Sequence, residues 1–350
     1  MYEGIKTAMG PTQNKTAPLK STTGEVITGK GQQIERWVGH YSELYSRHNV
    51  VTTSALDAIK CLPVMGELDN EPTIDELSKA INSLASRKTP GSDGIPPDLI
   101  KYCKTTLLQP LHEVLFFARV IPVRLQKLAE RVYPESQCGF RAERSSIDMV
   151  FSLRQPQEKW REQQMPLYIA FIDLTKAFDL VSREGLFRIL PKIGCPPKVH
   201  SLIESFHTNM QGTVQFSGSI SEPFNISSGV KQGCVLAPTL FGIFFTLLLK
   251  HAFGTSKEAT YLRTGSDGRL FNLARLRAKT KVREALIRDM LFADDAAVSS
   301  HTQQELQLLM DRFSQASKDF GLSISLKKTN VLHGTRNRNT TNHYHRRLRA

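Results

Sequence analysis

Two acidic clusters, each set in a strand-like apolar run, constrain what this chain can fold into more than any other feature. Asp173 follows the apolar residues Phe171 and Ile172, and the pair Asp294 and Asp295 follows the segment Leu-Phe-Ala. A carboxylate in such surroundings is costly to bury unless a positive group meets it, and hard oxygen ligands of this kind suit Mg²⁺. The two clusters therefore predict strands that bring the carboxylates together as a two-metal site for phosphoryl transfer.

The charge of the chain indicates a polyanionic partner. The 350 residues carry a formal net charge of +13, and Lys and Arg gather in residues 263–288 and 336–349. A basic protein with clustered carboxylates favours nucleic acid as the substrate, with metal as the partner of the acids. A solvated basic face is the alternative, and the clustering of the charge favours nucleic-acid contact over it.

Cysteine usage and hydropathy predict a location inside the cell, in the nucleus or the cytoplasm. The cysteines are odd in number, widely spaced and without a CxxC pair, which argues against a disulfide framework and a zinc site; they are Cys61, Cys103, Cys138, Cys195 and Cys234. Residues 1–20 lack the apolar core of a signal peptide. The most apolar run, residues 240–249, is too short to span a bilayer and predicts a buried helix instead. We expect no membrane contact.

Periodicity and capping signals predict an α+β chain. Helices are expected at residues 34–45, 145–163 and 182–193, and after the capping-box patterns that begin at Thr73 and Thr302. Strands are expected at residues 168–174, 213–216, 224–227 and 322–326, and a strand, acidic turn and strand at 290–299.

Six motifs occur in an order that resembles the reverse transcriptase of LINE-type (non-LTR) retrotransposons. Four are similar to its palm motifs: Phe-Ile-Asp-Leu-Thr-Lys-Ala-Phe-Asp at 171–179, Gly-Val-Lys-Gln-Gly-Cys-Val-Leu-Ala-Pro at 229–238, Phe-Ala-Asp-Asp at 292–295 and Gly-Leu-Ser-Ile-Ser-Leu-Lys-Lys-Thr at 321–329. Gln-Cys-Gly-Phe-Arg at 137–141 resembles the segment before the palm, and Lys-Thr-Pro-Gly-Ser-Asp-Gly at 88–94 resembles the fingers. An isolated Asp-Asp pair would be typical of a polar β-turn; the ordered set favours the polymerase.

The resemblance, which covers about residues 30 to 332, implies a right-hand polymerase palm, an antiparallel sheet with packed helices. The implied layout is a flexible lead at 1–30, N-terminal linker helices and partial fingers at 31–145, the palm at 146–332 and a basic disordered tail at 333–350. The implied reaction is RNA-directed DNA polymerisation from an RNA template, a DNA primer and dNTPs, with attack of the primer 3′-hydroxyl and release of pyrophosphate.

The resemblance also implies roles for individual residues. Asp173 and Asp294 would ligate two Mg²⁺ ions, with Mn²⁺ as an alternative, and Asp295 would support the site. The remaining candidates are nucleotide or template contacts. Phe178 would be a steric gate against ribonucleotides, Gln232 and Gly233 would lie against the nascent base pair, Lys328 would lie near the leaving pyrophosphate and Arg141 would meet template or nucleotide. A core aromatic for Phe178, a solvent-exposed lysine for Lys328 and a surface salt bridge for Arg141 are the structural alternatives.

The sequence departs from the family pattern in the fingers and beyond the palm. The basic β-hairpin that precedes the Gln-Cys-Gly-Phe segment is not visible, because residues 111–117 pass directly through 118–124 into 125–130. About 21 residues follow Thr329, too few for a helical thumb bundle. The chain is interpreted as a fragment of an element-derived reading frame with an internal deletion, whether a real deletion or a splice junction wrongly assigned.

Three other functions stay open beside polymerisation. A catalytically dead palm that still binds nucleic acid is consistent with the basic charge. A metal-dependent nuclease also uses clustered carboxylates, although it has no need of the Lys-Gln-Gly-Cys segment at 231–234. A product too incomplete to fold stably is the third, since absent fingers and thumb would leave exposed edges.

Overall fold

The computed structural model describes residues 19–21, 23–71, 73–84, 86–87, 94–104, 120–163, 166–254, 260–263, 284–287 and 289–334. Several predicted segments lie outside the described residues: most of the lead, residues 88–93 of the fingers-like segment 88–94, residues 111–117, most of the basic segment 263–288 and the tail from 335. The chain divides into two compact units, one formed by Met1–Ser46 with Asn209–Ile226 and the other by Arg47–Thr208 with Ser227–Ala350.

The larger unit is built on a four-stranded antiparallel sheet in the order β10-β1-β9-β8. Its strands are β1 (Leu167–Ile172), β8 (Asp289–Phe292), β9 (Asp295–Ser300) and β10 (Asn330–Gly334). The predicted strand, acidic turn and strand at 290–299 is confirmed as the β8–β9 hairpin. The central position of β1 explains its apolar sequence, because both of its faces are covered.

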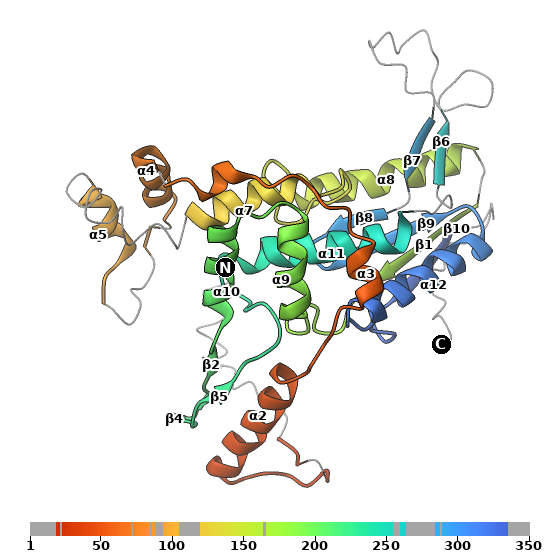
Figure 1. Cartoon of the computed structure of the whole chain (residues 1–350). Coiled ribbons are helices and arrows are strands. Elements are labelled where there is room, and N and C mark those ends of the chain that lie inside the picture. Colours follow the sequence, from red (N-terminus) through yellow and green to blue (C-terminus); the bar gives the residue numbers. More distant parts are fainter. Residues whose placement is uncertain are drawn as a thin grey trace, which may run out of the picture. The chain divides into compact units, whose positions relative to one another are not determined.

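Helices cover the two faces of this sheet (Figure 1). Helix α8 (Ser146–Gln163) packs along β8, and α12 (Gln303–Asp319) packs on β1 and β9. The face toward α8 holds a core of Leu167, Ile169, Met290 and Ala297, with Met149 and Leu153 of α8 against it. Because side chains alternate along a strand, Phe171 and Asp173 continue this α8 face beyond Ile169.

Local capping fixes where the predicted helices begin. The Thr73 side chain and Glu76 form the predicted capping box of α4 (Ile74–Asn82), and the Thr302 side chain accepts a hydrogen bond from Glu305 at the start of α12. Ser182 caps α9 (Arg183–Lys192) in the same way. Gly321, with φ +73°, follows the last turn of α12 and lets the chain leave the helix.

Helix α11 (Ala237–Phe253) is buried along most of its length. Its sequence is apolar on nearly every side, and it packs against α12, α9 and α7 (Ile121–Glu130). The expected buried helix at 240–249 is therefore confirmed. In the part of the chain that the structure describes, no helix has the length and apolar character needed to cross a membrane.

A buried arginine ties α7 to the segments that precede it. Arg124 is 3% exposed; its guanidinium donates to the carbonyls of Leu68 at 2.7 Å and Asn70 at 2.6 Å, and it pairs with Glu76 at 3.0 Å. The remaining elements of this unit are α3 (Thr53–Asp57), η1 (Gly66–Asp69), α5 (Pro97–Tyr102), α10 (Pro197–His207), β6 (Thr260–Arg263) and β7 (Glu284–Ile287).

In the described residues of the smaller unit there are one helix and two short strand pairs. Helix α2 (Lys30–Tyr45) carries Trp37, Tyr41 and Tyr45 as a stacked aromatic row. Strand β2 (Gln211–Gly212) pairs with β5 (Phe224–Asn225), and β3 (Gln215–Phe216) pairs with β4 (Ser219–Ile220). The sequence predicted a strand at 213–216 and another at 224–227. The structure has shorter strands at β3 and β5 and adds β2 and β4, and Ser217 and Gly218, which both have positive φ, form the turn of the β3–β4 hairpin.

The predicted strand at 322–326 is wrong. Only Ile324 forms a bridge, with Leu174, and Leu326 is exposed. The amides of Lys328 and Thr329 turn back onto the carbonyl of Ser325, so the chain makes a turn here and the strand β10 begins at Asn330. The alternation of apolar residues reflected a short anchoring contact rather than a ladder.

Candidate active site

The two acidic clusters meet at one end of the sheet. Asp173 follows the last residue of β1, and Ala293 with Asp294 forms the turn between β8 and β9, with Asp295 opening β9. In the antiparallel register Ile172 pairs with Ala296. One residue further along this register, Asp173 stands across from Asp295.

The backbone of Asp173 is anchored by the loop after α12. Its carbonyl accepts a hydrogen bond from the Ser325 amide at 2.8 Å, and its own amide donates to Thr329 Oγ1 at 3.4 Å. The segment Gly-Leu-Ser-Ile-Ser-Leu-Lys-Lys-Thr thus holds the acidic end of β1 in place. It also brings Lys328 over Asp173, with Nζ at 3.4 Å from Oδ1.

The three carboxylates share one electrostatic field. The Asp295 side chain is exposed, yet partial loss of water raises its pKa, and the charges of Asp294 and Asp173 raise it further. Lys328 acts in the opposite direction and lowers the pKa of Asp295. A cluster of like charges opposed by one cation is an arrangement that a bound divalent ion would stabilise.

The oxygen donors fit a hard cation, although they do not enclose one. Asp173 Oδ1 is buried and accepts no hydrogen bond from any described residue, and the Lys328 ammonium forms an ion pair with it at 3.4 Å. Carboxylate oxygen is a ligand that Mg²⁺ and Mn²⁺ prefer. Within the described ranges, no three or more His, Cys, Asp or Glu side chains already surround a metal position.

A pocket of about 360 Å³ opens beside these carboxylates. Its walls are mostly apolar and come from α8 and the α8 face of the sheet, including Met149, Leu153 and Phe171. Asp173, Asp295 and Lys328 supply charged groups to its lining. The size and the mixture of an apolar wall with a few charged groups are typical of a small-molecule site.

Phe178 stands half-buried between two other aromatic rings. It stacks on Phe241 of α11 at a centroid distance of 4.3 Å, and Phe140 meets it edge to face at 6.4 Å. The stacking fixes the plane of the ring, and its partial exposure leaves one side for contact with another molecule.

The loop that carries Gln232 and Gly233 is attached to the Phe178 turn. The Val230 amide donates to the Phe178 carbonyl at 2.9 Å, and Gly229, at φ +78°, lies so close to Asp179 that a Cβ would be 2.5 Å from its carbonyl oxygen. Gln232 and Gly233 themselves are exposed, and Gly233 has φ +87° with open space around it. The structure therefore brings this loop to Phe178 and leaves its tip uncovered.

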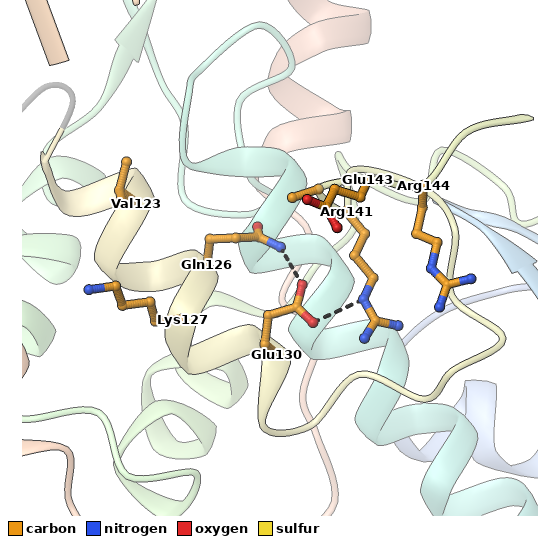
Figure 2. A pocket seen from close by; sticks show the side chains of 8 residues that line it. Val123, Gln126, Lys127, Glu130, Arg141, Glu143 and Arg144 are labelled. Atoms are coloured by element: carbon orange, nitrogen blue, oxygen red, sulfur yellow. Dashed lines mark hydrogen bonds and ion pairs between the residues drawn. The ribbon is translucent and has the colours of Figure 1, made fainter. Parts of the chain in front are cut away.

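Arg141 lines a different pocket from the one beside the carboxylates. This pocket, of about 620 Å³, lies between α7 and the loop that follows the Gln-Cys-Gly-Phe segment (Figure 2). Arg141 Nε donates to Glu130 at 2.9 Å and a second nitrogen lies 3.8 Å from Glu135, while Gln126 donates to the other Glu130 oxygen. The salt bridge that the sequence left as an alternative is present.

One residue of the matched motifs acquires a contact that sequence reasoning missed. Gln137 is 1% exposed, and its side-chain oxygen accepts a hydrogen bond from the amide of Ala293, in the acidic turn. The motif Gln-Cys-Gly-Phe pointed to the segment, but nothing in the sequence pointed to the partner, which is 156 residues away.

Comparison with known proteins gives a consistent set of similarities. The family model described as reverse transcriptase (RNA-dependent DNA polymerase) matches residues 116–344. The probable RNA-directed DNA polymerase from transposon BS of Drosophila melanogaster is 22% identical over an alignment 289 residues long that covers 66% of this chain and 31% of that protein. The RNA-directed DNA polymerase from mobile element jockey of the same organism is 26% identical over 241 residues, 67% of this chain and 23% of that protein.

Solved structures give a weaker likeness. Telomerase from Candida albicans, in complex with a fragment of telomeric RNA, is similar with a TM-score of 0.46 and 14% identity, over 89% of this chain and 46% of that chain. The chain spans less than a third of the length of the two curated Drosophila relatives.

Proposed function

The chain belongs to the reverse transcriptase (RNA-dependent DNA polymerase) family, and we propose that its palm adds deoxynucleotides to a primer 3′ end by two-metal nucleotidyl transfer. The observation that carries this proposal is the meeting of Asp173 with Asp294 and Asp295 at one end of the sheet, where the charges of Asp294 and Asp173 both raise the pKa of Asp295. Nucleotidyl transfer needs carboxylates from neighbouring strands in this arrangement.

Divalent metal is general in this family, and the donor chemistry of the site fits it. Asp173 and Asp294 would hold the ions, and Asp295 would support them. Bound Mg²⁺, or Mn²⁺ in its place, would lower the pKa of the attacking hydroxyl and neutralise charge on the triphosphate. The Oδ1 atom of Asp173 supports a ligand role, because it is buried and accepts no hydrogen bond from the described residues, and its ion pair with Lys328 at 3.4 Å shows that it can meet a cation.

The residues around the carboxylates would orient the substrates. The half-exposed ring of Phe178, held flat by Phe241, would lie under the incoming sugar and reject a 2′-hydroxyl. Gln232 and Gly233, on the uncovered loop attached to Phe178, would meet the nascent base pair. Lys328 would leave Asp173 for the pyrophosphate and donate a proton to it.

Arg141 would serve the template only after a change of partner. Its guanidinium is occupied by Glu130, and a phosphate would have to compete with that carboxylate. Arg141 is nevertheless proposed as a template contact, because the Glu130 carboxylate is exposed to solvent and ion pairs near the surface are weak.

The proposed substrates are an RNA template with a DNA primer and dNTPs. The net charge of +13 supports a polyanionic partner. Residues 31–145 would form linker helices and partial fingers, residues 146–332 the palm, and residues 333–350 a basic tail. The five cysteines are free, which supports a reducing compartment, the nucleus or the cytoplasm.

A palm that binds nucleic acid without catalysis is the second candidate, favoured by one observation. The Lys328 ammonium already compensates Asp173, so a chain that never takes up metal would still be neutralised at this point. The origin in a non-LTR element would be the same, and only the chemistry would be lost.

Primer extension separates the two candidates. The full chain is incubated with a poly(A)–oligo(dT) hybrid, labelled dTTP and Mg²⁺, beside a variant with Asp294→Ala and Asp295→Ala. Extension that the double variant loses would support polymerisation. A folded chain that binds the hybrid but adds no labelled nucleotide would support the second candidate, a palm that binds nucleic acid without catalysis.

A further inference from the structure

The Gln-Cys-Gly-Phe segment runs along the outer edge of the sheet. The Cys138 amide donates to the Leu291 carbonyl at 2.9 Å, and the Leu291 amide donates to the Ser136 carbonyl at 3.1 Å. Gln137 and Leu291 form a parallel bridge, so the segment pairs with β8, which is an edge strand of the four-stranded sheet. It therefore covers the strand that leads into the acidic turn.

A single oxygen of Gln137 joins this segment to the turn. Gln137 Oε1 accepts from the Gly139 amide at 2.8 Å and from the Ala293 amide at 3.3 Å, and both hydrogen bonds are buried. An amide oxygen has two lone pairs, so both are used. Without this oxygen the Ala293 N–H would be buried and unpaired, which is costly.

Ala293 needs such support because of its backbone conformation. Its φ is +58°, in the left-handed region that residues with a Cβ adopt only at a cost. Gly139 packs so closely against it that a Cβ on Gly139 would overlap the Ala293 nitrogen and would lie 2.8 Å from its Cα. The turn is thus held from two sides by one segment.

We propose that Gln137 and Gly139 are positioning residues that hold the left-handed Ala293 and so fix the directions of Asp294 and Asp295. Ala293 is followed directly by Asp294 and then Asp295, and a change of its φ would swing the two carboxylates away from Asp173. We call these contacts the brace: the hydrogen bonds that Gln137 Oε1 accepts and the close packing of Gly139 on Ala293. The inference rests on the proposed function for its chemical meaning, but the brace is a property of the metal-free chain.

Hydrogen exchange of the metal-free full chain tests the brace. Gln137→Met keeps the length of the side chain and removes the acceptor. Cys138→Ala is the matched control, since Cys138 is buried in the same segment and its contact with Leu291 uses the backbone. The measured quantity is the ratio of the exchange rate of amides 289–295 to that of the α12 amides. This ratio should rise about tenfold in Gln137→Met, because the turn loses the free energy of about one net hydrogen bond. The ratio should not change in Cys138→Ala.

A second substitution guards against a variant that does not fold. Glycine accepts a positive φ without strain, so Ala293→Gly should make the turn less dependent on the brace. Gln137→Met should then cost less stability in the Ala293→Gly background than in the wild-type background. Equal costs in the two backgrounds, or equal exchange ratios in Gln137→Met and Cys138→Ala, would overturn the brace.

Binding of Mn²⁺, followed by electron paramagnetic resonance, tests whether the brace positions the acids. Gln137→Met should bind Mn²⁺ about tenfold more weakly, and Cys138→Ala within about twofold of wild type. A loosened turn with unchanged Mn²⁺ binding would overturn the positioning role. A wild-type chain that binds Mn²⁺ in this way but does not extend primers would refute the proposed function alone.

Discussion

The Lys328 ammonium lies 3.4 Å from Oδ1 and 3.5 Å from Oδ2 of Asp173 and so joins the turn before β10 to the acidic end of β1. The lysine side chain is 71% exposed and the carboxylate 29%, so the pair is a weak one that substrate could separate. A cation that is close to the acids and largely exposed is consistent with the proposed role of Lys328 as proton donor to the leaving group.

Lys328→Arg therefore discriminates between a proton donor and a simple cation. Arginine keeps the charge but does not give up a proton near neutral pH, so kcat for nucleotide addition should fall about 100-fold. Hybrid binding should stay within about threefold of wild type. Lys327→Arg is the matched control at the neighbouring exposed lysine and should leave kcat unchanged. Full activity of Lys328→Arg would remove the proton-donor role.

Phe178→Val should weaken the rejection of ribonucleotides. The smaller side chain opens space under the sugar, and the preference for dTTP over UTP in kcat/KM should fall by tenfold or more. Phe187→Val is the control, since Phe187 is also half-buried but packs against His200 and His207 of α10. An unchanged preference in Phe178→Val would assign the ring to the core alone.

The buried His207 should make the stability of the larger unit depend on pH. Loss of water lowers the pKa of His207, and the nearby charge of Arg183 lowers it further, against the raising effect of its hydrogen bond to the Ile203 carbonyl. The unfolded chain therefore binds a proton near pH 6.5 that the folded chain does not take up. The free energy of unfolding should fall as the pH drops below about 6.5.

Urea unfolding at pH 7.5 and 5.5 measures this dependence. His207→Gln removes the titrating group, so its free energy of unfolding should change less between the two pH values than that of wild type. The same pH dependence in both proteins would assign the effect to other groups.

Arg124→Met should destabilise the packing of α7 against η1 and α4 by about 3 kcal/mol. The substitution leaves the carbonyls of Leu68 and Asn70 and the carboxylate of Glu76 without their shared donor. Adding Glu76→Gln should recover about 1 kcal/mol, because it removes the unpaired charge. Chemical denaturation measures both values, and a loss below about 1 kcal/mol would contradict the account.

Local signals explain the parts of the fold that the sequence predicted. The caps at Thr73 and Thr302 and the apolar run of α11 depend on residues a few positions apart, and all three elements formed as expected. The family motifs likewise pointed to the palm, and the family is confirmed by a match over residues 116–344.

Contacts between distant residues explain the parts that it did not predict. The turn at 325–329 forms because the amides of Lys328 and Thr329 donate to the Ser325 carbonyl, while the Ser325 amide donates to Asp173. Periodicity does not reveal these hydrogen bonds, and the alternation of apolar residues alone therefore suggested a strand. The pairing of Arg141 with Glu130 and the hold of Gln137 on Ala293 also depend on the tertiary fold. The assignment of roles to individual site residues stays a prediction that the experiments above address.

Titration of Mn²⁺ shows most directly whether Asp173 and Asp294 bind the same metal ion. Mn²⁺ binding to the full chain is titrated for wild type, Asp173→Asn and Asp294→Asn, with Asp311→Asn, on the exposed surface of α12, as control. Each site substitution should weaken the same binding event by tenfold or more, and the control should not. Wild-type binding that survives both site substitutions would contradict a shared metal site at the end of the sheet.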